Sequence, residues 1–158
     1  DIKMFYAENK TIWTVNTTTK TNITCKVDLV NKTTEAMTYF ERRYYWHSTK
    51  ESNDLEGKFM KMGLFTNNNS AFDGMAVGPK GASYTTKEQL VSVSGNYSCG
   101  LFSVSLVHGV PWYELRVVNT TVEHIPQECL NLTKNVARPE QPWKTLYNST
   151  CKNILKNN

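Results

Sequence analysis

Much of the chain alternates between apolar and polar residues with a period of two, which is typical of β-strands that bury one face. The clearest case is segment 22–30, where Ile, Cys, Val and Leu fall on one face and Thr, Lys and Asp on the other. Other segments of similar length are rich in aromatic and β-branched residues. Together these patterns predict strands over 11–18, 22–30, 36–46, 58–66, 71–77, 83–94, 101–107 and 112–118.

Turn-forming residues separate these segments. Residues 31–34 and 67–70 are polar and predict turns, and Gly78-Pro79-Lys80-Gly81 is a strong turn signal. His108-Gly109-Val110-Pro111 joins the last two strands in a hairpin. About eight strands with short connections predict an all-β, mainly antiparallel sandwich or barrel.

The pattern changes after the last strand. Residues 127–137 suit a helix that ends at Arg138-Pro139, and residues 141–152 predict one or two further helical turns that begin near Pro142. No segment resembles a linker or an internal repeat. The chain of 158 residues therefore predicts a single domain over 1–158.

Asparagine-linked glycosylation sequons indicate the compartment. Asn-x-Ser/Thr occurs at nine of the 16 asparagines, where chance predicts roughly three. The cysteines are even in number, which also fits an oxidising compartment. We therefore expect a secreted, extracellular glycoprotein whose leader was removed before Asp1. The sequons are Asn9, Asn16, Asn22, Asn31, Asn68, Asn96, Asn119, Asn131 and Asn148.

Several classes of function find no support in the residues. The formal net charge of +4 is scattered, without the basic stripe of a nucleic-acid binder or the roughly 20-residue apolar run of a membrane span. His47, His108 and His124 form no metal-ligand motif, no phosphate-binding loop is present, and no cysteine pair has C-x-x-C spacing. We expect no enzyme activity, no metal and no cofactor.

The four cysteines lie at positions 25, 99, 129 and 151. Four cysteines allow three disulfide pairings, and spacing alone does not choose among them.

Tyr113-Glu114-Leu115 is followed by Ile125-Pro126-x-x-Cys129-Leu130-Asn131 and by the distant Cys151-Lys152. This order resembles the tick salivary lipocalins, whose best-known members are the histamine-binding proteins. The resemblance covers roughly the last third of the chain, with weaker support from Thr24-Cys25-x-Val27.

The resemblance implies an eight-stranded up-and-down lipocalin barrel with a C-terminal helix packed outside. It also implies disulfides Cys25–Cys151 and Cys99–Cys129. The implied function is capture of a small host molecule, without catalysis, which dampens inflammation or immunity where a tick feeds. We expect a monomer.

The chain departs from the family's amine-binding motif. Amine binders of the family carry Cys-Asp-aliphatic and then Glu-Leu-Trp or Glu-Leu-Tyr, but here the Asp position is Gly100 and the aromatic position is Arg116. Strand alternation places Phe102 and Val104 on the same face as Gly100, which makes that wall apolar. Arg116 lies two residues from Glu114, roughly 7 Å away on the same face, and could pair with it.

A buried amine needs a carboxylate that is not already neutralised. We therefore expect a largely apolar ligand with one polar end, such as a sterol, fatty acid or eicosanoid. The candidate ligand-binding residues are Tyr39, Glu41, Tyr45, Phe59, Phe102, Val104, Trp112, Glu114 and Arg116.

Three alternatives stay open. The ligand is a biogenic amine such as histamine or serotonin, or the barrel is filled by its own aromatic residues. In the third alternative, loops bind a host immune protein, for which aromatic residues such as those at 44–46 are candidates.

Overall fold

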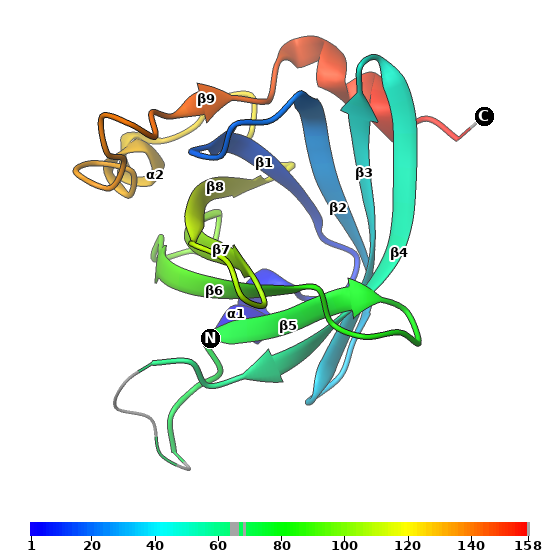
Figure 1. Cartoon of the computed structure of the whole chain (residues 1–158), viewed down its shortest axis with the longest axis vertical. Coiled ribbons are helices and arrows are strands. Elements are labelled where there is room, and N and C mark those ends of the chain that lie inside the picture. The colour runs from blue at the N-terminus through cyan, green and yellow to red at the C-terminus, as the bar shows by residue number, and fades with distance from the viewer. Residues whose placement is uncertain (64–66, 68, 158) are drawn as a thin grey trace.

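The computed structural model describes residues 1–63, 67 and 69–157. Strands dominate the described chain, with short helices near both ends (Figure 1). The elements are α1 Ile2–Phe5, β1 Thr11–Thr17, β2 Ile23–Thr33, β3 Met37–Trp46, β4 Thr49–Met60, β5 Gly74–Pro79, β6 Thr86–Val93, β7 Cys99–Leu106, β8 Trp112–Val118, α2 Gln127–Asn131, β9 Lys144–Thr145 and the 3₁₀-helix η1 Ser149–Leu155.

The strands close into a barrel. They follow the order β2-β3-β4-β5-β6-β7-β8-β1, all neighbours are antiparallel, and β1 pairs back with β2. The short strand β9 adds to β1 at Asn16 and Thr17. The eight-stranded up-and-down barrel expected from the sequence is confirmed.

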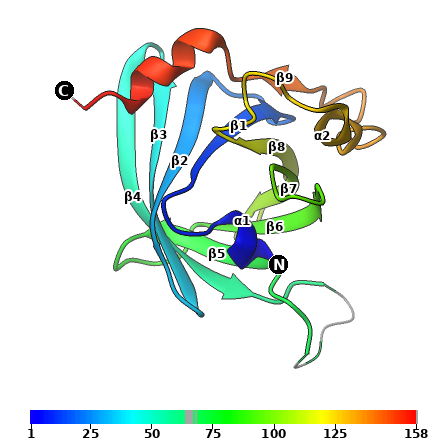
Figure 2. The ribbon, with the colours of Figure 1, turned by 180° about the vertical axis from the view of Figure 1, so that it is seen from behind.

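The two ends of the barrel differ. Because neighbouring strands are antiparallel, the connections 18–22, 47–48, 80–85 and 107–111 all lie at one end, which we call the mouth. The helix α1 lies across the opposite end (Figure 2). Ile2 donates a backbone hydrogen bond to the Phe72 carbonyl (3.0 Å), and Phe5 and Tyr6 are fully buried against the inner core.

Apolar residues are buried on both faces of the sheet. The inner core includes Phe40, Phe59, Met75, Phe102 and Val104, together with residues of α1. A second core lies on the outer face, beneath the part of the chain that follows β8, which we call the C-terminal segment. This outer core includes Trp13, Val27, Leu115, Val117 and Ile154. The outer core explains why β1, β2 and β8 carry apolar residues on faces that point away from the barrel interior.

Two disulfides attach the C-terminal segment to the barrel. Cys25 is bonded to Cys151 and Cys99 to Cys129, as the family resemblance implied. The first bond spans 126 residues of sequence, so it restricts the unfolded chain strongly. Arg43 on β3 adds hydrogen bonds from its guanidinium to the carbonyls of Ile154 (3.1 Å) and Leu155 (3.2 Å).

The fourth predicted strand is displaced. The sequence predicted a strand over 58–66, whereas β4 runs over Thr49–Met60. Residues 49–54 are polar and show no alternation, but each pairs with a residue of β3. The part of the prediction at 64–66 lies outside the described residues.

The C-terminal predictions are also corrected. The helix predicted over 127–137 is confined to α2, and Asn135 has φ = 61°, which is incompatible with a continuing α-helix. The helix predicted over 141–152 is wrong at its start, because this segment forms β9 along the edge of β1 before η1 begins. Leu146 donates to the Val15 carbonyl (2.7 Å) there. The helix α1 was not predicted from the sequence.

Candidate functional site

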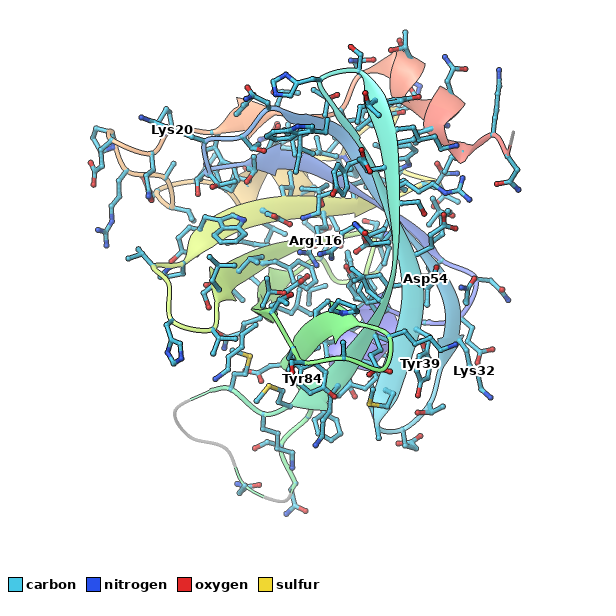
Figure 3. All side chains as sticks on the ribbon, turned by 45° about the vertical axis from the view of Figure 1, so that its right-hand side comes forward. Lys20, Lys32, Tyr39, Asp54, Tyr84 and Arg116 are labelled. Carbon is cyan, nitrogen blue, oxygen red and sulfur yellow. A yellow bond between two sulfur atoms is a disulfide. The ribbon has the colours of Figure 1, made fainter. Side chains whose placement is uncertain are left out.

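Six charged side chains meet inside the barrel and form one continuous network. Three are carboxylates and three are cations, so their formal charges cancel. They are Lys26 and Asp28 from β2, Arg42 from β3, Glu88 from β6, and Glu114 and Arg116 from β8. Figure 3 shows Arg116 in the interior.

One half of the network surrounds Glu88, which is fully buried. Arg42 reaches it at 3.0 Å and also contacts Asp28 at 2.7 Å. Arg116 approaches the same Glu88 oxygen at 2.7 Å. Burial acts to raise the pKa of Glu88, but Arg42 and Arg116 outweigh it and hold the pKa well below its usual value. Glu88 is therefore ionised.

The other half surrounds Glu114. Arg116 Nη2 lies 2.8 Å from its Oε1, Lys26 Nζ lies 3.1 Å from its Oε2, and the Trp112 indole donates to Oε2 at 2.9 Å. Burial acts to raise the pKa of Glu114, but Lys26 and Arg116 lower it to about 2. The expected Glu114–Arg116 pair is confirmed, and Lys26 is a second partner that the sequence analysis did not identify.

Tyr6, just after α1, links the closed end of the barrel to this network. Its hydroxyl donates to Asp28 Oδ2 (2.7 Å) and accepts from Arg116 Nη1 (2.8 Å). Burial raises the pKa of Tyr6 well above its usual value, although Arg116 opposes the shift. Tyr6 therefore stays protonated and donates its proton to Asp28.

Every carboxylate oxygen of the network has a hydrogen-bond donor within the protein. Each oxygen of Asp28, Glu88 and Glu114 accepts at least one hydrogen bond from within the protein. Lys26 differs, because an ammonium has three N–H donors and both of its hydrogen bonds in the network go to Glu114. Lys26 thus has an N–H left over beyond its two hydrogen bonds to Glu114, whereas every carboxylate oxygen of the network already has a donor.

Apolar side chains fill the interior between the network and α1. Gly100 faces this region, and a Cβ placed on it would lie 2.7 Å from Leu90 Cδ1 and 3.3 Å from both Phe102 Cε1 and Phe5 Cε2. The position where the family's amine binders carry Asp therefore has no room for a carboxylate side chain.

On the other side of the network, toward the mouth, the side chains are less buried than those beside α1. Tyr44 and Trp112 are half-buried there, while Trp46, Asn53 and Leu106 are exposed. Asn53 pairs with the inward-facing Arg42 across the strands and contacts the Tyr44 hydroxyl at 3.4 Å. We call this part of the interior the mouth-side region, and it is the candidate site for a ligand.

Six of the predicted ligand-binding residues face the interior. Two of them, Phe59 and Phe102, belong to the packed part of the inner core, and Val104 is buried beside them. Trp112, Glu114 and Arg116 line or form the network.

The other three lie on the outer face of β3. Tyr39, Glu41 and Tyr45 alternate with Phe40 and Arg42, which point inward. Glu41 pairs with Arg43 at 2.7 Å, Tyr45 packs against the outer core, and Figure 3 shows Tyr39 on the outside. These three residues therefore do not share the interior with the others, because alternation along β3 turns their side chains to the outside of the barrel.

Four of the six charged residues of the network, and the tyrosine that is hydrogen-bonded to it, were not identified from the sequence. They are Tyr6, Lys26, Asp28, Arg42 and Glu88. The alternation in 22–30 did place Lys26 and Asp28 on one face, but a polar face ordinarily points to solvent. In this barrel the C-terminal segment covers the apolar face of β2 on the outside, so the polar face points to the interior. The position of that segment could not be read from the sequence.

The predicted sequons differ in exposure. Most are exposed, whereas Asn16 and Asn119 are half-buried, and Asn68 lies outside the described residues. Asn16 is part of β1 and pairs with both β8 and β9.

Within residues 1–63, 67 and 69–157, no cluster of His, Cys, Asp and Glu could hold a metal ion. In the same residues, no helix has the length and apolar character needed to cross a membrane.

No protein-family model matches the sequence, and no curated protein matches it. Solved structures do resemble the chain. One is Japanin from Rhipicephalus appendiculatus bound to cholesterol, with a TM-score of 0.63, 12% identity, and coverage of 91% of this chain and 96% of Japanin.

A second structure is AM182 in complex with serotonin, with a TM-score of 0.58, 15% identity, and coverage of 90% of this chain and 85% of AM182. At these identities the likeness establishes the fold. The chain has a closed eight-stranded barrel, and this is the fold that it shares with Japanin and AM182.

Proposed function

We propose that the protein is a secreted tick salivary lipocalin that sequesters a small, mostly hydrophobic ligand in its barrel and so modulates host inflammation or immunity. A sterol, fatty acid or eicosanoid is the expected class. One observation carries the proposal: the buried carboxylates of the barrel are already paired with the protein's own cations.

Amine binding would have to break this arrangement. An ammonium ligand gains most from a carboxylate that lacks a partner, but Glu114 already contacts Arg116 and Lys26. An added cation would also lie close to both of these positive groups. The network therefore disfavours histamine and serotonin on electrostatic grounds.

An apolar ligand suits the mouth-side region better. Trp112, Tyr44 and Leu106 offer apolar surface above the network. Lys26 retains a donor that a hydroxyl, carbonyl or carboxylate of the ligand would accept. The arrangement matches a ligand with a long apolar body and one polar end.

The structural neighbours bear on both candidates. Japanin holds cholesterol, which supports the apolar class, and AM182 holds serotonin, which keeps the amine as the second candidate. The difference between these ligands shows that this barrel fold alone does not fix the ligand.

The test combines extraction with calorimetry. The glycosylated protein is secreted from insect cells, extracted with organic solvent, and the extract analysed by mass spectrometry for lipids and sterols. Histamine and serotonin are titrated into the protein by calorimetry. We expect recovery or uptake of an apolar ligand and no amine signal.

Two results would count against the proposal. Tight histamine or serotonin binding that Glu114→Gln abolishes would establish the amine scavenger instead. A barrel that takes up neither class would favour the loop-mediated binder of a host immune protein.

A further inference from the structure

A hollow of about 400 Å³ at the closed end of the barrel is built almost entirely from glycosylation sequons. Its lining consists of the complete triplets 9–11, 96–98 and 119–121, together with Val118. The first triplet leads into β1, the second lies between β6 and β7, and the third follows β8. The fold thus brings three of the nine predicted sequons together at one place, which we call the sequon hollow.

The triplet 119–121 lies between the other two, because β8 lies between β1 and β7 in the sheet. Asn119 donates its backbone N–H to the Thr11 carbonyl (2.8 Å), and the adjacent Val118 donates to the Ser98 carbonyl (2.9 Å). Thr11 and Ser98 are the last residues of the other two sequons. A sugar attached to Asn119 therefore has a neighbouring triplet on each side.

The Asn119 side chain is held in an orientation that leaves its glycan-bearing atom accessible. Its Oδ1 accepts a hydrogen bond from the indole of the fully buried Trp13 (2.9 Å). Nδ2, the atom that carries an N-linked glycan, lies on the opposite side of the planar amide. Nδ2 donates to no described residue, and among these residues the one buried side-chain nitrogen or oxygen without a partner belongs to Trp143, so Nδ2 reaches solvent. A glycan on Asn119 is therefore compatible with the bond to Trp13.

The lining of the sequon hollow offers groups that bind a sugar. Lys10 has three N–H donors, and the hydroxyls of Thr11 and Thr120 both donate and accept, which suits the hydroxyl and acetamido groups of N-acetylglucosamine. The half-buried Tyr97 adds an aromatic ring, on which the C–H face of a sugar can pack. A sugar attached at the hollow has an effective concentration in roughly the millimolar range, so weak contacts are enough to hold it there.

We propose that the first N-acetylglucosamine of a glycan on Asn119 occupies the sequon hollow and contacts the triplets on both sides. Asn119 is half-buried, whereas Asn9 and Asn96 are exposed, so glycans on these two residues extend from the rim. The sugar on Asn119 then joins three segments that are distant in sequence, at the end of the barrel that α1 closes. This inference rests on the proposed secretion of the protein and not on the ligand in its barrel.

The direct test is protection of this glycan from an endoglycosidase. The full chain is secreted from mammalian cells treated with kifunensine, so that its glycans keep the oligomannose form that endoglycosidase H cleaves after the first sugar. Peptide mass spectrometry then reports occupancy and cleavage at each sequon, in native and in denatured protein. In native protein we expect cleavage at Asn119 to be about tenfold or more slower than at the exposed Asn131, because the sugar must first leave the hollow. In denatured protein the two rates should be equal.

Two substitutions of Thr121 test whether the sugar stabilises the fold. Thr121→Ala removes the sequon but keeps the Asn119 side chain and its bond to Trp13. Thr121→Ser is the matched control, because it keeps the sequon and differs from Thr121→Ala by one hydroxyl. The melting temperature of Thr121→Ala should lie about 2–4 °C below that of Thr121→Ser, since the contacts of the sugar with the neighbouring triplets are lost.

A protected Asn119 glycan together with the lower melting temperature of Thr121→Ala supports the proposal. Asn119 without a glycan, in protein whose Asn131 is occupied, overturns it, and so do equal cleavage rates at the two sites in native protein. Equal melting temperatures of the two Thr121 variants also overturn it. Protein without a glycan at any sequon would remove the expected glycosylation as well, whereas none of these results bears on the ligand that the barrel holds.

Discussion

At the scale of single residues, Arg116 lies on β8 between two carboxylates, 2.8 Å from Glu114 and 2.7 Å from Glu88. The guanidinium is fully buried and stacks 4.2 Å above the Phe102 ring. A buried charge is tolerated only while its partners are present, so each member of the network depends on the others. Substitution of one residue therefore tests the whole group.

Glu114 should make stability depend on acid pH. Its pKa is lowered from the ordinary 4.5 to about 2 in the folded protein, so its stabilisation is complete above about pH 4.5 and is lost as the pH falls through 2. A shift of this size corresponds to about 3 kcal/mol. Urea unfolding between pH 7 and pH 2 measures it.

In Glu114→Gln, the free energy of unfolding should fall less steeply between pH 4.5 and pH 2 than in the unaltered protein. Glu88 still titrates in this variant and in the same direction, so part of the slope remains. Identical slopes in the two proteins would show that Glu114 is not held by the network.

Gly100→Asp should not restore an amine site. The new Cβ would lie 2.7 Å from Leu90 Cδ1, and the carboxylate would enter an apolar region. Overpacking of this kind typically costs about 1–3 kcal/mol, and the buried charge adds to it. We expect a lower melting temperature and no gain of histamine affinity.

Gly95→Ala is the control for added bulk, because a Cβ there would meet only Glu128 Oε1, at 3.9 Å, among the described side chains. It should leave the melting temperature nearly unchanged. A stable Gly100→Asp variant that binds histamine would contradict the packing described for this region.

Part of the site could be predicted from the sequence. Glu114 and Arg116 are two residues apart on one strand, and such residues necessarily share a face. Arg42 and Glu88 could not be joined in the same way, because they lie on β3 and β6 and meet only across the closed barrel. Which face of β2 and β3 points into the barrel depends on the C-terminal segment, because this segment covers their outer face. The pattern of residues did not predict where the segment lies.

At the scale of elements, α1 closes one end of the barrel and contributes to the network through the residue that follows it. Tyr6→Phe removes the hydroxyl between Asp28 and Arg116 and leaves both groups with fewer partners. The loss should be about 1–3 kcal/mol in the free energy of unfolding. Urea unfolding measures it, with the exposed Tyr84→Phe as the control.

An unchanged stability of Tyr6→Phe would show that α1 is held by its apolar residues alone. Ile2 and Phe5 bury fully in the inner core, so they would be the remaining candidates.

Strands with alternating residues were predictable, and elements determined by their neighbours were not. Segment 22–30 overlaps β2 from Ile23 onward, and the strands at 101–107 and 112–118 match β7 and β8 closely. The polar start of β4 is a strand because β3 pairs with it along its whole length. The segment before η1 is a strand and not a helix because β9 pairs with Asn16 and Thr17 of β1. Tertiary contacts override local propensity in both cases.

At the scale of the whole molecule, the barrel wall separates two apolar cores. The inner core holds the charged network, and the outer core joins the wall to the C-terminal segment through both disulfides. This division explains how a chain with 39% hydrophobic residues buries both faces of several strands. The glycosylation predicted for the exposed sequons remains a prediction that intact-mass analysis can address.

The central feature of the molecule is a barrel whose buried carboxylates are neutralised by the protein's own cations. The most direct measurement is native mass spectrometry of the glycosylated protein after incubation with equal concentrations of cholesterol, arachidonic acid, histamine and serotonin. We predict a complex with one of the two apolar ligands and none with either amine. A complex with histamine or serotonin that disappears in Glu114→Gln, without any apolar complex, would contradict the account.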